Sequence, residues 1–248
     1  GLKNVAKEMG HISKIFRASR FQIVYDKKSP ELFYDGKYLK NYDVFIVRPS
    51  VLEEVDLHVV LVSQMEMKGI ILFNKYQSIL NAKNKIKTMQ ILDNKKIPIP
   101  KTVLVHRPDD LAQAAKFVGG FPVIVKRPIG SFGHGVMIVE SMRALQSVLT
   151  WEEPVYLLQE YVKYSKGKDI RIFVINGKVV GSMMRVAKKG EFRSNIGLGG
   201  TGTPVEITPE EADIAIRGVE ALGLDYGGVD VIRSVEGPVI LEINSNPG

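Results

Sequence analysis

The stretch "GGVDVIRSVEGPVILEINSNPG" (227–248) holds two short apolar runs, at 228–233 and 239–244, with the turn-forming residues 234–238 between them. Runs of this length that are rich in Val and Ile and bounded by Gly, Ser and Pro are typical of β-strands. The stretch therefore predicts a β-hairpin, and the polar residues inside its apolar runs need an explanation.

The two faces of the second strand differ in chemistry. Because successive side chains of a strand point to opposite faces, one face is expected to be apolar and buried. That face consists of Val239, Leu241 and Ile243. The other face carries Ile240, Glu242 and Asn244. If the strands pair symmetrically about the turn, Asp230 lies opposite Glu242.

This register would place two carboxylates side by side. Directly opposed like charges destabilise a sheet unless a cation lies between them. Asp, Glu and Asn offer only oxygen ligands, which favours a hard ion such as Mg²⁺ over zinc. The hairpin alone leaves two interpretations open, a metal site and a solvent-facing polar stripe, because short polar alternation is common at exposed sheet faces.

Composition and charge limit the class of protein. Of 248 residues, 45% are hydrophobic and 25% are charged, which suffices for one large domain or for two to three lobes. The absence of cysteine excludes disulfides, thiolate nucleophiles and zinc fingers. With no signal peptide and no apolar run of membrane-spanning length, we expect a cytoplasmic protein without a membrane partner. The net charge of +7 favours nucleotide phosphates, nucleic acid or carboxylate-rich substrates.

Helical and extended patterns alternate in the first 74 residues. Apolar runs at 42–49 and 69–74 predict strands and the segment 55–69 predicts a helix, which favours a small parallel α/β lobe. The chain opens with what resembles the end of an amphipathic helix closed by Gly10. We therefore expect a further strand before this helix and a further helix after residue 248.

The middle of the chain predicts a second set of helices and strands. Helices are expected at 76–95, 108–118 and 142–150. Strands are expected at 102–106, 121–127, 136–140 and 155–162.

The last third predicts mostly antiparallel structure. Asn176-Gly177 between two apolar runs is a strong hairpin signal. The polar, Gly-rich segment 187–205 predicts a long loop. Thr208, Pro209 and Glu211 predict a helix that begins with a capping box.

A glycine-rich segment follows the strand that ends at Lys126, with glycines at 130, 133 and 135. Glycines let backbone N–H groups approach phosphate oxygens, and the lysine adds a positive charge. A β-branched strand follows instead of a helix, which excludes a P-loop or a dinucleotide fingerprint. A flexible flap over phosphates and an ordinary surface hairpin both remain open.

Seven stretches in this order carry a resemblance to a known family. They are "NKIKTMQIL", "FPVIVKRPIGSFGHGV", "LLQEYV", "GKDIRIFV", "GEFRSN", "GGVDVI" and "LEINSNPG". Together they resemble the ATP-grasp superfamily, and within it the RimK-like carboxylate–amine (α-L-glutamate) ligases. The resemblance implies an α/β (α+β) fold with a pre-ATP-grasp lobe at 1–78. A central lobe at 79–154 with the flap and a C-terminal lobe at 155–248 with the metal site would clasp the nucleotide.

The resemblance also implies a set of site residues. The phosphate-binding residues would be Lys85 and Lys126 with the flap residues Gly130, Ser131, Gly133 and Gly135. The connector that binds adenine through its backbone would be Gln159, Glu160, Tyr161 and Val162, with Asp169 near the ribose. Arg193 and Asn195 would lie near the terminal phosphates. The catalytic residues would be Arg193, Arg171 and Lys126, and Asp230, Glu242 and Asn244 would bind two Mg²⁺ or Mn²⁺ ions.

The implied reaction needs no nucleophilic side chain. ATP phosphorylates a carboxylate, and an amine attacks the acyl phosphate to give an amide. The resemblance favours glutamate added to a protein C-terminus or to a glutamate-terminated acceptor, without DNA and in a homo-oligomer. The alternatives are a ligase that acts on a coenzyme tail or an amino-group carrier protein, and a catalytically inactive nucleotide-binding or nucleic-acid-binding protein.

Overall fold

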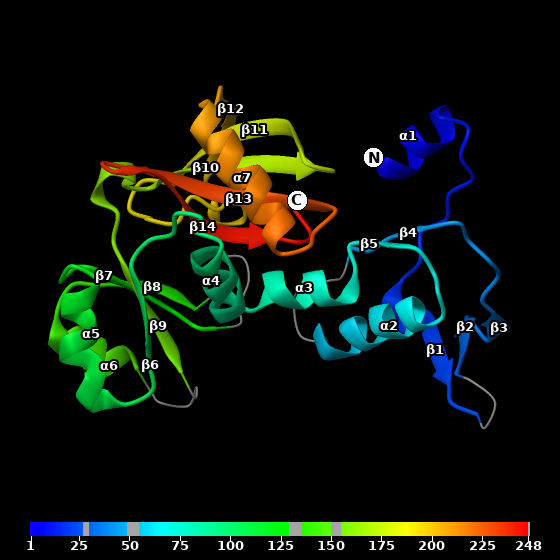
Figure 1. Ribbon diagram of the computed structural model, residues 1–248, viewed down its shortest axis with the longest axis horizontal. Coiled ribbons are helices and arrows are strands. Elements are labelled where there is room, and N and C mark those ends of the chain that lie inside the picture. Colours follow the sequence, from blue (N-terminus) through cyan, green and yellow to red (C-terminus); the bar gives the residue numbers. More distant parts are fainter. Residues whose placement is uncertain (27–29, 49–54, 129–134, 150–154, 248) are drawn as a thin grey trace. The chain divides into compact units, whose positions relative to one another are not determined.

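The computed structural model describes residues 1–26, 30–48, 55–128, 135–149 and 155–247 (Figure 1). The chain divides into two compact units, Gly1–Leu72 and Phe73–Gly248, and each is described by itself. Within the described ranges, no helix is long and apolar enough to span a lipid bilayer.

The first unit contains a three-stranded antiparallel sheet that the sequence pattern did not predict. Helix α1 (Leu2–Glu8) and the short helix η1 (Ala18–Arg20) precede its strands β1 (Phe21–Val24), β2 (Glu31–Tyr34) and β3 (Lys37–Tyr38). Asp35 and Gly36 join β2 to β3 with φ angles of 52° and 70°. An Asp-Gly pair is a strong hairpin signal, so the sequence did carry the information needed for this turn.

The strands predicted at 42–49 and 69–74 are much shorter than expected. They are β4 (Phe45–Ile46) and β5 (Leu72–Phe73), and the helix between them, α2 (Val55–Met67), is confirmed. The N–H of Phe45 donates to the carbonyl of Ile71 at 2.9 Å. The pair β4-β5 has only two short strands, so the larger sheet of the unit is the antiparallel sheet β1-β2-β3. The alternation of elements had predicted a parallel lobe instead.

The second unit contains two sheets, of which the smaller has the strand order β6-β9-β7-β8 and is antiparallel throughout. Its strands are β6 (Thr102–Val105), β7 (Val123–Lys126), β8 (Val136–Val139) and β9 (Tyr156–Glu160). The short helix η2 (Pro108–Asp110) leads into α5 (Leu111–Phe117), and α5 and α6 (Met142–Val148) pack on this sheet. Strand β9, which the sequence placed in the C-terminal lobe, completes this sheet.

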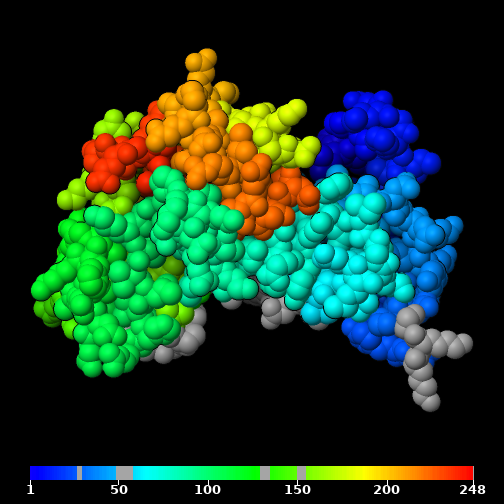
Figure 2. All heavy atoms as spheres, viewed as in Figure 1, coloured from blue at the N-terminus to red at the C-terminus, as the bar shows by residue number. Residues whose placement is uncertain are grey.

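The larger sheet has the order β12-β11-β10-β13-β14. Its strands are β10 (Lys168–Ile175), β11 (Lys178–Val186), β12 (Thr201–Pro204), β13 (Tyr226–Ser234) and β14 (Gly237–Asn244). Helices α4 (Lys85–Asn94) and α7 (Pro209–Ala221) pack on one face, and α7 forms part of the outer surface in orange (Figure 2).

Alternation along β10 and β13 divides the sheet into an apolar and a charged face. Ile170 and Ile172 belong to the core beneath the helices. Asp169 and Arg171 are the residues on either side of Ile170 in sequence and so point to the opposite face, as does Asp230 of β13. The fold therefore concentrates charge on the face that the helices do not cover.

Two local predictions are confirmed by backbone geometry. Asn176 and Gly177 join β10 to β11 with φ angles of 47° and 68°, as a two-residue hairpin turn requires. Thr208 caps α7, and Glu211 closes the capping box with Pro209 in the first turn.

The helix predicted at 76–95 is interrupted at Asn84, which corrects that prediction. Helix α3 (Tyr76–Lys83) ends there and α4 begins with Lys85. The Asn84 side chain accepts hydrogen bonds from the N–H groups of Ile86 at 2.9 Å and Lys87 at 3.2 Å. An asparagine side chain that accepts from the first N–H groups of a new helix favours starting that helix over continuing the preceding one.

The loop predicted at 187–205 is partly ordered. It contains the short helix η4 (Ile196–Leu198) and strand β12, which pairs with β11 although all of its residues are exposed. A Cβ on Gly200 would lie 2.5 Å from the carbonyl oxygen of Ser194, so only glycine fits this turn. An exposed edge strand needs no apolar alternation, which is why the sequence pattern missed β12.

The register of the final hairpin confirms one prediction and corrects another. Asp230 lies opposite Glu242, as expected. The register shifts directly afterwards, because Val231 pairs with Ile240 and leaves Leu241 as an extra residue. This bulge turns Ile240 into the core with 0% exposure, whereas Leu241 lines the same cavity as Glu242.

Replacing Ile240 by glutamine is expected to lower the free energy of unfolding by at least about 3 kcal/mol, because a buried amide without partners is costly. Leu241→Gln is the matched control and should cost less than about 1 kcal/mol, since that side chain faces a polar cavity. Urea unfolding of both variants measures the difference. A larger loss for Leu241→Gln would contradict the observed bulge.

Candidate active site

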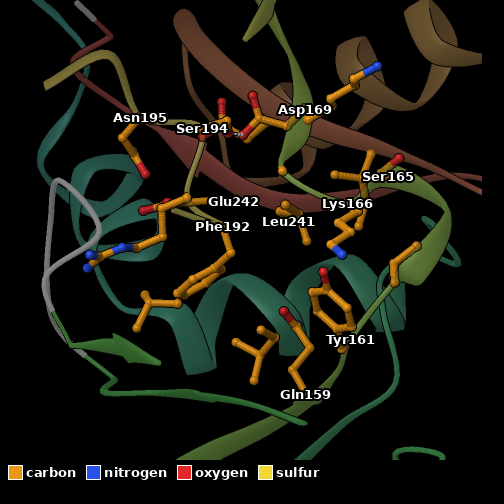
Figure 3. Close-up of a pocket in the computed structure, with 18 of the residues that line it drawn as sticks. Gln159, Tyr161, Ser165, Lys166, Asp169, Phe192, Ser194, Asn195, Leu241 and Glu242 are labelled. Carbon is orange, nitrogen blue, oxygen red and sulfur yellow. Dashed lines mark hydrogen bonds between the residues drawn. The ribbon is translucent and has the colours of Figure 1, made fainter. Parts of the chain in front are cut away.

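The two sheets of the second unit enclose a cavity that collects most of the predicted site residues (Figure 3). The smaller sheet contributes Ile124, Lys126, Val136 and Gln159. The larger sheet contributes Asp169, Arg185, Asp230, Ile232, Leu241 and Glu242. Lys85 of α4 and the segments 160–162, 165–168 and 192–195 complete the lining.

Lys126 is held in the cavity by Gln159. The Lys126 Nζ donates to Gln159 Oε1 at 2.6 Å, and Gln159 Nε2 donates to Thr102 Oγ1 at 2.8 Å. Burial lowers the pKa of Lys126 to about 8, although the attraction of Glu242 opposes this shift. The repulsion of Lys85 lowers the pKa of Lys126 further. The cavity thus presents an ammonium group whose charge depends on what binds beside it.

A buried network of charges occupies the floor of the site. Asp230 Oδ1 accepts from Arg171 Nε, and Asp230 Oδ2 accepts from the Nη2 atoms of Arg171 at 2.9 Å and Arg185 at 2.8 Å. Arg185 also donates to both oxygens of Asp169, at 2.6 Å and 2.7 Å. Ser194 Oγ donates to Asp169 Oδ2 and closes the network (Figure 3).

The two aspartates of this network differ in proton affinity. Burial raises the pKa of Asp230, but the attraction of Arg171 and Arg185 outweighs it and holds the pKa below its ordinary value. Burial dominates at Asp169 and raises its pKa, because Arg185 and Ser194 only partly offset the lost hydration. The network therefore keeps Asp230 ionised.

The connector is fixed at Glu160, the last residue of β9. The N–H of Glu160 donates to the carbonyl of Lys101 at 2.9 Å, and Glu160 Oε1 accepts from the N–H of Lys101 at 3.1 Å. The Glu160 N–H is therefore occupied. Among the residues that the structure describes, the N–H of Val162 has no protein acceptor.

The segment 191–195 brings both an aromatic ring and a cation to the cavity. Phe192 points into it from this segment and Tyr161 from the connector (Figure 3). Arg193 pairs with Glu191 at 2.7 Å, and this hydrogen-bonded ion pair lowers the pKa of Glu191 to about 2. Asn195 and Glu242 both line the cavity (Figure 3).

The carboxylates fit a hard divalent cation, although no group of three His, Cys, Asp or Glu side chains with metal-ligand geometry occurs in the described ranges. Asp230 and Glu242 are paired across the strands, and the three hydrogen bonds to Asp230 leave about one lone pair on Oδ1. A site with few protein oxygens suits Mg²⁺, which keeps water and phosphate ligands.

Some predicted residues lie elsewhere. Arg171 is absent from the described lining and reaches the cavity only through Asp230. Asn244 and Gly135 are also absent from that lining. The flap residues Gly130, Ser131 and Gly133 fall outside the described residues.

The sequence pattern missed several lining residues. Leu241 was assigned to the core because a bulge cannot be seen in an alternating pattern. Phe192 and Ser194 lie inside the stretch "GEFRSN", from which only Arg193 and Asn195 were predicted as site residues. Lys168 likewise lies inside the stretch "GKDIRIFV" without a role assigned to it, and no local signal marked Lys166.

Two sheets that close on a cavity lined by Lys85 and Lys126 together with the carboxylates of Asp230 and Glu242 form the arrangement expected of a nucleotide-dependent ligase of the ATP-grasp type. Residues 82–248 match the RimK-like ATP-grasp domain, and residues 1–79 match the RimK pre-ATP-grasp domain. The chain belongs to the RimK-like ATP-grasp family and is an ADP-forming carboxylate–amine ligase.

Relatives and solved structures agree with this assignment. The chain is 39% identical over 251 residues to a probable α-L-glutamate ligase of Coxiella burnetii, covering 100% of this chain and 83% of the relative. One from Methanococcoides burtonii is 38% identical over 251 residues with the same coverage.

The fold is shared with more distant structures. A RimK domain ATP-grasp protein from Sphaerobacter thermophilus aligns with a TM-score of 0.76 at 18% identity, over 99% of this chain and 86% of that one. The ATP-grasp ligase PsnB, complexed with minimal precursor, Mg and ADP, aligns with a TM-score of 0.74 at 18% identity, over 100% and 85%.

Proposed function

We propose that this ligase joins the α-amino group of glutamate to a carboxylate that ATP has activated as an acyl phosphate. The acceptor is a protein C-terminus or another glutamate-terminated molecule. The observation that carries the proposal is the cavity that brings Lys85, Lys126 and Arg193 together with Asp230 and Glu242. The names of the curated relatives supply the choice of glutamate.

Different residues of the cavity bind the nucleotide and stabilise the phosphoryl transfer. Lys85 and Lys126 bind the phosphates, and Arg193 stabilises the charge on the phosphoryl group in transfer. The N–H of Val162, which has no acceptor among the described residues, reads the adenine edge, while Glu160 holds the connector in place. Arg171 acts by fixing Asp230 rather than by touching substrate.

Asp230, Glu242 and Asn244 would hold Mg²⁺, with two ions expected. The metal would supply charge neutralisation between the phosphates. Arg171 and Arg185 already neutralise Asp230. We therefore expect Mg²⁺ to bind weakly alone and much more tightly with ATP, whose phosphates add negative charge.

An assay tests the proposal directly. ATP and Mg²⁺ are supplied with each amino acid in turn and with peptides that end in glutamate, and the products are analysed by mass spectrometry. Peptides extended by glutamate, with ADP formed in equal amount, are expected. Extension by another amino acid, or none with any acceptor, would contradict the proposal.

The affinity for Mg-ATP is expected to fall above about pH 8. The lowered pKa means that Lys126 loses its charge in the free protein as the pH rises through about 8. Bound phosphates restore the charge, so binding takes up a proton and affinity drops by up to about tenfold per pH unit. Calorimetry at about pH 8.5 in buffers of different ionisation enthalpy measures this uptake.

Lys126→Met is the control for this pH dependence, because it removes the titrating group. Its remaining affinity should not vary over the same pH range. Proton uptake that persists in Lys126→Met would assign the effect to another group.

A further inference from the structure

Asn74 is a fully buried residue that lies two positions before α3 in the second unit. Its Oδ1 accepts from the N–H groups of Asp225 at 2.7 Å and Tyr226 at 3.1 Å. Its Nδ2 donates to the carbonyl oxygens of Tyr226 and Ser245, both at 2.9 Å. The amide thus uses every hydrogen-bonding position that it has.

These partners lie beside the proposed metal ligand Asn244, where β13 begins and β14 ends. Asp225 and Tyr226 lead into β13, and Ser245 directly follows Asn244, the last residue of β14. One side chain therefore joins the start of one strand to the end of its neighbour. The same segments are in close contact at Gly228, where a Cβ would lie 2.7 Å from Pro247 Cβ.

The side chain of Asn244 has little other support. Its Nδ2 is buried and finds no hydrogen-bond partner among the described residues. Its placement therefore depends on the backbone from which it projects. That backbone is fixed on one side by β13 and on the other by the hydrogen bond from Asn74 to Ser245.

We propose that Asn74 is a positioning residue for the ligase reaction, because its amide holds the end of β14 where Asn244 can complete a Mg²⁺ site. This inference rests on the proposed function. Asn74 itself touches neither nucleotide nor metal, so its loss should weaken metal binding while leaving the adenine end of the site unchanged.

Ser78 offers a matched control on the adjoining helix. Its Oγ donates to the carbonyl of Gly223 at 2.5 Å, so it anchors α3 to the turn before β13. Within the described ranges its side chain forms no hydrogen bond with the residues after β14, so Ser78→Ala should affect stability alone.

The experiment compares the full chain with Asn74→Ala and Ser78→Ala by calorimetry of ATP binding at increasing Mg²⁺. We expect Asn74→Ala to raise the Mg²⁺ concentration for half-maximal tightening by about tenfold or more, as losing outer-shell support does. Affinity for ATP without metal should stay the same. Ser78→Ala should change neither quantity.

The outcomes separate the two proposals. An unchanged Mg²⁺ requirement in Asn74→Ala overturns the positioning role while the proposed function stands. If the unaltered chain binds ATP with no effect of Mg²⁺, the proposed function fails and the positioning role fails with it. Should Asn74→Ala not fold, Asn74→Asp decides by the same criterion, because it keeps both acceptor bonds and loses the donations to Tyr226 and Ser245.

Discussion

Replacing Asp230 by asparagine is expected to lower the free energy of unfolding by about 3–5 kcal/mol, measured in urea without nucleotide or metal. Asp230 is only 4% exposed and neutralises two buried guanidinium groups. Without its charge, Arg171 loses its ionic partner and Arg185 keeps only Asp169. Removing one member of a buried ion pair leaves an uncompensated charge, which is why the loss is large.

Asp213→Asn is the control for this prediction. Asp213 pairs with Arg217 at 3.0 Å on the exposed face of α7. An exposed pair of this kind is worth less than about 1 kcal/mol. Similar losses for Asp230→Asn and Asp213→Asn would show that the buried network does not stabilise the sheet.

Glu242→Gln is expected to lower kcat/KM by at least about a hundredfold, because Glu242 is a proposed ligand of the Mg²⁺ that neutralises the phosphates, and the loss of such electrostatic stabilisation has an effect of that order. Stability without ligands should change by less than about 1 kcal/mol. The carboxylate lines an open cavity, and its opposite neighbour Asp230 is already neutralised by two arginines. Urea unfolding and steady-state kinetics of the same preparation measure both effects.

A second readout separates a direct electrostatic role of Glu242 from a general disturbance. The attraction of Glu242 raises the pKa of Lys126. Glu242→Gln should therefore lower that pKa further, and the fall in Mg-ATP affinity should begin at a lower pH. An unshifted pH profile with full activity would remove Glu242 from the site.

The pairing of Asp230 with Glu242 was predicted from strands placed symmetrically about residues 234–238, but the observed turn pairs Ser234 with Gly237 and alone would place Asp230 opposite Leu241. The bulge at Leu241 restores the predicted pair. This bulge could not be predicted, because a one-residue insertion leaves the apolar pattern of "VILEI" unchanged. Strict alternation therefore places Leu241 in the core and Ile240 on the cavity face, which is the reverse of what the structure shows. The same limit applies to Asn84, whose capping role depends on the helix break that it stabilises.

The roles of the arginines also required the structure. The sequence shows that Arg171 and Arg185 are near the site in the chain, but their partners come from other strands. Arg171 pairs with Asp230, which is 59 residues away. Asn74 was still harder to predict, since its partner Ser245 is 171 residues away and Asn74 lies in no recognised motif. Contacts between distant segments depend on strand order, which local patterns do not encode.

The central claim is that the carboxylate is activated as an acyl phosphate, and isotope transfer tests it most directly. A glutamate-terminated peptide with ¹⁸O in its terminal carboxylate is incubated with ATP, Mg²⁺, glutamate and the enzyme. One carboxylate oxygen should pass to phosphate, so the inorganic phosphate released should carry one ¹⁸O for each amide formed. Amide formation that releases unlabelled phosphate, or AMP and pyrophosphate, would contradict the mechanism.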